Sequence, residues 1–286
     1  MSIGDVTLTA AMRANLFSLQ QTDVLTGRTQ ERLASGKRVN SALDNPTNFF
    51  AARGHTQRAD LLNGLKDNIS EAIQTVKAAD SAVTAINKSL EQLRGVLTQA
   101  REALNSSTSA TQLAGLADQY NEIIRQINNL RTDASYKGVN FLAGTGVSLT
   151  VNFNEEATTS LTMSGFNGSA SGLALSGGTQ TGAGNLAVAN IDTAAEIDSA
   201  ETAINNAIAT LRTRSGQLAA NLSILTTRQE FITKTVNTLV EGATKLTVAD
   251  TNEEGANMLA LQTRQQLGVT SLALASQAAQ AVLRLF

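Results

Sequence analysis

Residues 65–104 carry a long and regular pattern of apolar and polar positions. Apolar side chains recur there at alternating steps of four and three residues over more than five heptads, which is the spacing of a coiled-coil seam. At 1.5 Å per residue, this helix is about 60 Å long. Its apolar stripe needs partners to be stable, so the rest of the chain is expected to supply them. The positions are Leu65, Ile69, Ala72, Val76, Ala79, Val83, Ile86, Leu90, Leu93, Leu97, Ala100 and Leu104.

Two later segments repeat this pattern. Residues 113–130 predict a shorter helix that folds back antiparallel on the first after the polar turn at 105–110. Residues 197–246 predict a second long helix of about 75 Å, in which Glu201, Ser215 and Gln229 hold positions that are otherwise apolar. The three seams can close on one another.

The two ends of the chain predict helices that lack sufficient partners. A helix over 5–35 stops at Gly36, and the next begins at Pro46 with Asn45 or Asp44 as its cap. A final helix over 252–286 is apolar on nearly all faces, and only the N-terminal helix remains to cover it. Ordering both ends costs more than their mutual burial returns, so we expect them to fold when other copies surround them.

Such a chain is typical of a polymer subunit, and head-to-tail contacts that do not close give an open helical filament. The residues predicted to form the polymer interface are Leu8, Met12, Leu16, Leu19, Leu33, Met258, Leu261, Leu267, Val269, Leu272, Leu274, Val282, Leu283, Leu285 and Phe286.

The middle of the chain changes its period from helix to strand. Val147, Leu149, Val151 and Phe153 alternate with polar residues, as do Leu161 and Met163, which predicts a hairpin. Residues 165–190 are rich in Gly, Ser and Ala and are expected to form a surface excursion rather than core. The predicted fold class is mainly α, a long antiparallel helical coiled-coil bundle with a small β-hairpin region in the middle of the chain.

Composition narrows the function classes. Only 3% of the 286 residues are aromatic and 16% are charged, the formal net charge is -2, and Cys and Trp are absent. The sequence contains no basic patch of the kind that binds nucleic acid. It also contains no apolar run of about 18 residues, the length needed to span a membrane. The first residues lack a basic region followed by a continuous apolar run, so no ordinary secretory signal is expected, and any export would take another route.

Candidate chemical groups are sparse. His55 has no neighbouring cysteine or paired carboxylates, which favours a helix-surface or interface role over metal binding. Glu155–Glu156 and Glu253–Glu254 are adjacent pairs whose side chains point apart, so solvated charge is the favoured interpretation. The sequence therefore predicts no enzyme, no cofactor and no metal site.

Three segments resemble the bacterial flagellin family. The stretch TQERLASGKRVNSALDNPTNFFAA at 29–52 is similar to the family's N-terminal signature, in which ERL-S-SG precedes R-[IV]-N-S-A-x-D. SYKGVNFL at 135–142 resembles the turn into the family's variable region. ANMLALQTRQQLGVTSLALASQAAQAVLRLF at 256–286 is similar to the family's C-terminal helix.

The resemblance implies a structural subunit that polymerises into the flagellar filament for motility. It places residues 1–40 and 250–286 in an inner tube of terminal helices, and residues 41–249 in a helical shell that includes a short variable region at 140–190. The implied location is extracellular. The implied partners are other copies of the chain, the flagellar export apparatus, an export chaperone, the filament cap and hook-junction proteins.

Two alternatives to a filament subunit stay open at this point. A hook-filament junction protein shares the same terminal helices, and a secreted pore-forming or translocator protein is also helical and Ala-rich. The resemblance also implies that Leu93, Arg94 and Leu97 correspond to the region that the innate immune flagellin receptor recognises. There the family's acidic residue is replaced by Gly95, which weakens the expectation of recognition.

Overall fold

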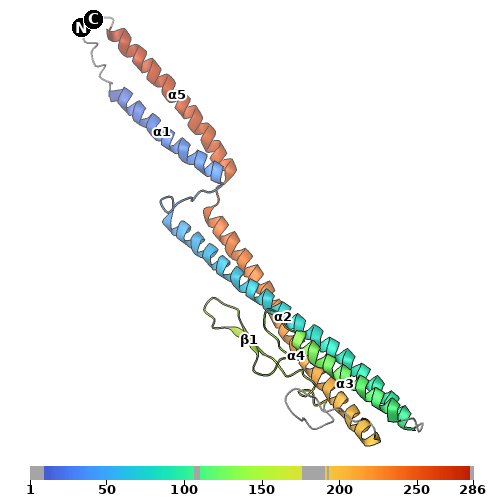
Figure 1. Cartoon of the computed structure of the whole chain (residues 1–286). Helices are drawn as coiled ribbons and strands as arrows, with labels where there is room; N and C mark the ends of the chain where they lie inside the picture. Colours follow the sequence, from blue (N-terminus) through green and yellow to red (C-terminus); the bar gives the residue numbers. More distant parts are fainter. Residues whose placement is uncertain (1–9, 106–109, 176–190, 192, 284–286) are drawn as a thin grey trace. The chain divides into compact units, whose positions relative to one another are not determined.

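A computed structural model describes residues 10–105, 110–175, 191 and 193–283 (Figure 1). The predicted fold class is confirmed, because five helices and one two-stranded antiparallel sheet are present among these residues. The elements are α1 (Ala10–Ser35), α2 (Pro46–Asn105), α3 (Ala110–Asp133), β1 (Ser148–Asn152), β2 (Ser160–Ser164), α4 (Ala194–Thr247) and α5 (Thr251–Leu283).

The chain forms two compact units. Residues up to 59 together with residues from 237 onward make one, here called the terminal unit, and residues 60–236 make the other, the central unit. Helices α2 and α4 each contribute to both units. Helices α1 and α5 lie wholly within the terminal unit.

Local chemistry explains where the helices begin and end. Gly36 follows α1 with a φ of 66°, a left-handed conformation that glycine adopts without strain. The amide of Asn48 donates to Asn45 Oδ1 at 3.1 Å, so Asn45 is the cap of α2, as predicted, and Pro46 is its first residue. Thr193 and Glu196 form a reciprocal capping box at the start of α4.

In the central unit α2 and α4 pack antiparallel through a mainly apolar seam. Their largest side chains with almost no exposure include Ile69, Ile86, Leu90 and Leu93 of α2 and Ile197 of α4. Burying an aliphatic side chain of this size contributes about 1.5–3 kcal/mol, so this seam is the main source of the unit's stability.

The three polar seam positions of α4 each meet a polar partner on α2. Arg101 pairs with Glu201 at 3.1 Å, Ser215 Oγ donates to Asp80 Oδ1 at 2.9 Å, and Gln229 Nε2 donates to Ser70 Oγ at 2.6 Å. These α4 positions are two heptads apart from one to the next. The three pairs join complementary groups in the observed register and therefore favour it.

Helix α3 closes the central unit and carries a buried tyrosine. Figure 1 shows α3 lying along α2 and α4, with Tyr120, Ile124 and Ile127 buried against them. The hydroxyl of Tyr120 makes no hydrogen bond among the described residues, and burial raises its pKa to about 12. Tyr120 therefore acts as an apolar side chain in this core.

The predicted hairpin is present, with Leu149 opposite Met163 and Val151 opposite Leu161. Two arginines of α4 hold this region against the helix. The guanidinium of Arg228 lies 5.0 Å from the centroid of the Phe153 ring, and that of Arg214 lies 5.5 Å from the centroid of Phe166, both within the range of a cation–π interaction.

The prediction that residues 165–190 form no core is wrong for residues 165–175. Phe166, Ala170, Leu173 and Leu175 are buried. The backbone of this stretch is bonded to residues 141 and 142, and a Cβ at Gly165 would lie 2.7 Å from the carbonyl oxygen of Phe141. Glycine here permits close packing rather than flexibility. Residues 176–190 lie outside the described part of the chain.

We predict that Asp80→Ala lowers the free energy of unfolding by about 1–3 kcal/mol, because it leaves the part-buried Ser215 hydroxyl without its acceptor. Urea denaturation followed by circular dichroism measures this. The matched control is Asp67→Ala, an exposed aspartate on the same helix, which should change the stability by less than about 0.5 kcal/mol. Equal effects of the two substitutions would contradict the role given to Asp80.

Candidate functional site

The antiparallel pair of α1 and α5 in the terminal unit is the candidate functional site. The two helices lie side by side (Figure 1). Near one end of the pair Arg32 Nη1 lies 2.8 Å from Glu254 Oε1, and only 6% of Glu254 is exposed. Further along, Leu19 faces Gly268. The ion pair compensates a carboxylate that would be costly to bury alone.

The facing sides of this pair are thin and partly polar. Buried and half-buried positions recur on both helices at steps of three and four residues, which is coiled-coil spacing. On α1 they are Met12, Asn15, Leu19, Thr22, Thr26, Thr29 and Leu33, and on α5 they are Glu254, Met258, Leu261, Gln265, Gly268, Leu272 and Ala275. The seam therefore buries few large apolar side chains.

The buried threonines of α1 are satisfied within their own helix. Thr22 Oγ1 donates to the carbonyl oxygen of Ser18 at 2.9 Å, and Thr26 Oγ1 donates to that of Thr22 at 2.7 Å. Because these hydroxyls need no partner on α5, the threonines present their methyl groups to it and occupy little space.

Gly268 sets the distance between the helices. A Cβ at this position would lie 2.6 Å from Leu19 Cδ2, which is closer than carbon atoms pack. The absence of a side chain at Gly268 therefore lets α1 and α5 approach closely at this level.

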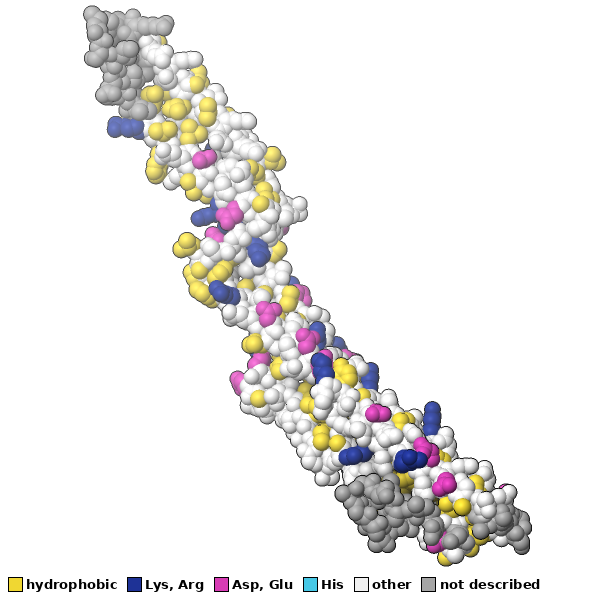
Figure 2. All heavy atoms as spheres, in the orientation of Figure 1, with side chains coloured by type: hydrophobic (Ala, Val, Ile, Leu, Met, Phe, Trp, Pro, Cys, Tyr) yellow, Lys and Arg dark blue, Asp and Glu magenta, His cyan; other side chains and the backbone are white. Residues whose placement is uncertain are grey.

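Many of the large apolar side chains of the pair lie outside the seam and are exposed. Leu267 of α5 is 66% exposed and Val24 of α1 is 68% exposed. Figure 2 shows hydrophobic side chains along the visible face of this pair with few charged ones among them, and α5 carries no charged residue after Arg264. The exposed set is Leu16, Phe17, Val24 and Leu25 of α1 and Leu259, Leu267, Val269 and Leu274 of α5.

An exposed apolar surface of this length is typical of a protein interface. Nothing in the described part of the chain covers this surface, since these residues are exposed there. No helix in the described part of the chain is long and apolar enough to cross a membrane.

The sequence-predicted interface residues divide into two groups. Met12, Leu19, Leu33, Met258, Leu261 and Leu272 line the seam between α1 and α5, whereas Leu16, Leu267, Val269 and Leu274 face outward. Leu8, Leu285 and Phe286 lie outside the described residues, as do the side chains of Val282 and Leu283.

Sequence reasoning missed part of this surface. Four outward-facing apolar residues were not included in the prediction, namely Phe17, Val24, Leu25 and Leu259. The seam threonines Thr22, Thr26 and Thr29 were also missed, although their three and four spacing continues from Met12 and Leu19. This spacing of three and four residues is the sequence pattern that distinguishes the inner face of α1 from its outer face.

Hydrogen bonds to residues 247 and 249, and others within the turn, hold the connection between α1 and α2 in place. Arg38 N donates to the carbonyl oxygen of Thr247 at 2.7 Å, and Ala249 N donates to that of Gly36 at 3.0 Å. Asp44 Oδ2 then accepts the amides of Ser41 and Asn40. These backbone donors hold the pKa of the Asp44 carboxyl below its ordinary value.

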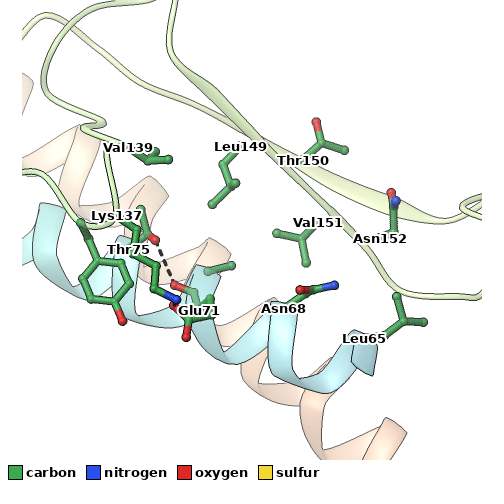
Figure 3. Close-up of a pocket in the computed structure, with 12 residues that line it drawn as sticks. Leu65, Asn68, Glu71, Thr75, Lys137, Val139, Leu149, Thr150, Val151 and Asn152 are labelled. Carbon is green, nitrogen blue, oxygen red and sulfur yellow. Dashed lines mark hydrogen bonds and ion pairs between the residues drawn. The ribbon is translucent and has the colours of Figure 1, made fainter. Parts of the chain in front are cut away.

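A groove of about 310 Å³ in the central unit lies between β1 and α2 (Figure 3). Leu65 of α2 and Leu149 and Val151 of β1 contribute apolar walls, and Lys137 Nζ lies 2.9 Å from Glu71 Oε2 at the side. Lys137 lowers the pKa of Glu71, and Glu71 raises that of Lys137. The ion pair ties the segment before the hairpin to α2.

The remaining candidates occupy ordinary positions. His55 is half-buried, near Gly242, and no cluster of three or more His, Cys, Asp or Glu side chains occurs among the described residues. Leu93 and Leu97 are buried in the central core, so of the residues assigned to immune recognition only Arg94 is exposed. Arg94 lies 3.8 Å from Glu91.

The N-terminal and C-terminal parts of the chain both match the same family of known proteins. Residues 6–146 match the bacterial flagellin N-terminal helical region, and residues 186–286 match the bacterial flagellin C-terminal helical region. The chain is 26% identical over 286 residues to flagellin FljM of Caulobacter vibrioides, covering all of both chains. It is 28% identical to a flagellin of Brucella melitensis, covering 95% of each chain. A crystal structure of Bacillus cereus flagellin aligns with a TM-score of 0.46 and 19% identity, over 58% of this chain and 88% of that one.

We predict that Gly268→Val displaces the Leu19 side chain and weakens the packing of α1 on α5, because the new side chain would overlap Leu19. The helix content of the terminal unit and its thermal stability should both fall, as measured by circular dichroism. Gly255→Ala on the same helix meets nothing within 4 Å and should stabilise α5 by up to about 1 kcal/mol. A Gly268→Val protein as stable as the wild type would refute the close approach.

We also predict that Asp44 stabilises the fold above about pH 4 and that this contribution is lost as the pH falls through its lowered pKa. The difference in free energy of unfolding between wild type and Asp44→Asn should therefore shrink between about pH 6 and about pH 2. Urea titrations at each pH measure it. A difference that stays constant with pH would show that the Asp44 charge does not stabilise the turn.

Proposed function

Since this chain belongs to the bacterial flagellin family and is a structural subunit of the flagellar filament, we propose that copies polymerise through the outward apolar face of the α1–α5 pair. A single observation carries this proposal. The pair mixes small, polar and apolar side chains in the seam between its helices and leaves Leu267, Val269 and Leu274 exposed on its outside. This arrangement is unfavourable for an isolated pair in water and favourable when neighbours cover it.

The free energy available from burying the exposed apolar side chains is large enough to drive assembly. Each large apolar side chain that becomes buried contributes about 1.5–3 kcal/mol, and eight of them are exposed on this pair. Part of that gain offsets the lost freedom of the joining copies. The surplus favours a polymer in which each copy is covered on several sides.

We assign residues 1–40 and 250–286 to an inner tube of terminal helices and residues 41–249 to a surrounding shell. The ends of α1 at Ser35 and of α4 at Thr247 lie close to these boundaries, which supports the assignment. In the same proposal the terminal helices gain their full order on assembly, because their own seam buries so little.

Membership of the flagellin family implies that the filament is extracellular and that its subunits assemble with one another. We propose further that the chain is exported without a cleaved signal peptide. Its partners on that route are the flagellar export apparatus, an export chaperone, the filament cap and hook-junction proteins. The family is one of structural proteins, and the chain is proposed to have no enzymatic activity. The matches are to flagellins and do not favour a hook-filament junction protein.

We predict that Leu267→Asp prevents polymerisation while the monomer stays folded, because Leu267 faces solvent in the single chain. Burying a carboxylate in place of a leucine at each contact should weaken association by at least about tenfold. Sedimentation after adding filament seeds measures polymer, and circular dichroism measures the monomer's fold. The control is Leu267→Met, which keeps an apolar side chain and should polymerise. Polymerisation by the Asp variant at the wild-type concentration would refute the proposed interface.

A further inference from the structure

Leu43 is the most exposed of the large apolar side chains in the described chain, at 96%. It lies in the turn from Ser41 to Asp44, where Asp44 N donates to the carbonyl oxygen of Ser41 at 3.2 Å. Turn positions of this kind usually carry small or polar residues. An apolar side chain held fully in water at such a site is unfavourable unless another surface covers it.

The turn that carries Leu43 is braced rather than loose. Asp44 Oδ2 accepts the amides of Asn40 at 3.1 Å and Ser41 at 3.0 Å, and also the Ser41 hydroxyl. Asn45 then caps α2 directly after the turn. Leu43 therefore projects from a fixed base, and little conformational freedom would be lost when it is covered.

The terminal unit also contains an open groove with apolar walls. Its volume is about 480 Å³, within the roughly 300–1,000 Å³ of ordinary ligand pockets, so it has room for a leucine side chain. Phe49 and Ala52 of α2 and Val240, Ala243 and Val248 form its apolar walls. Val240 is 49% exposed, so its side chain is only partly covered within its own chain.

We propose that Leu43 of one copy inserts into this groove on a second copy. Leu43 does not line the groove of its own chain and is exposed there, so an occupying Leu43 comes from a neighbour. The charges also match, because Lys37 and Arg53 line the groove while Asp44 stands beside Leu43. This inference rests on the proposed function, that copies polymerise.

The contact is continuous with the proposed α1–α5 interface. The turn follows the end of α1, and the groove residues Thr247 and Val248 precede the start of α5. Projection and groove are different surfaces of one chain, so each copy gives one and receives one. Head-to-tail contacts of this kind build an open filament when the rotation between copies does not close.

Cysteine cross-linking tests the contact directly, because the chain has no cysteine of its own. Leu43→Cys and Val240→Cys are purified as separate variants, mixed in equal amounts, polymerised with seeds and oxidised. Non-reducing electrophoresis should show a disulfide-linked dimer, and peptide mapping should locate the bond between the two positions. The same mixture left as monomers should give no such dimer.

The matched control replaces Val240→Cys by Ile224→Cys, an exposed apolar position of α4 in the central unit. Polymers of Leu43→Cys with this control should give no dimer that joins positions 43 and 224. Equal cross-linking to both positions, or none to position 240 in polymers that formed normally, would overturn the insertion.

Polymer stability gives an independent readout. Leu43→Asp should raise the concentration needed for seeded polymerisation by at least about tenfold, and Leu43→Met should leave it near the wild-type value. If the wild type polymerises and Leu43→Asp matches it, this inference fails and the proposed function stands. If Leu267→Asp also polymerises as the wild type does, the proposed interface itself fails.

Discussion

A long amphipathic helix is stable only beside a partner that stays in phase with it, and the central unit depends on that constraint. Its α2–α4 seam is apolar except where Glu201, Ser215 and Gln229 each meet a polar side chain of α2. Apolar burial stabilises the pairing, whereas the polar pairs select one register among several of similar apolar content. The hairpin region depends on the same register, because Arg214 and Arg228 of α4 hold Phe166 and Phe153.

The terminal unit arranges the same kinds of residue in the opposite way. Threonines, Gly268 and an ion pair share the seam between α1 and α5 with a few large apolar side chains, and eight other large apolar side chains lie outside it. A seam of this type determines which faces of the two helices meet, but it leaves much of their apolar surface exposed. The central unit is therefore built to hold together within one chain, and the terminal pair is built to be completed by neighbours. This division of labour suits a subunit of a filament.

Much of the fold was predictable because its periods are simple. The four and three spacing located the long helices, the alternation at Leu149 and Val151 located the hairpin, and the caps at Gly36 and Asn45 located two boundaries. The faces of α1 were not predicted as well, because threonine counts as polar although its methyl group packs in a seam. The stretch at 165–175 was misjudged because its glycines serve close approach to Phe141, which composition does not reveal.

The repeat in α4 restricts how this helix can change its length. Its inward polar positions and its arginines that reach the hairpin region recur with the same two-heptad spacing. An insertion or deletion of one or two residues would rotate everything beyond it by about 100° per residue, and would turn both sets away from their partners. Indels in α4 are therefore tolerable only as whole heptads with a matching change in α2.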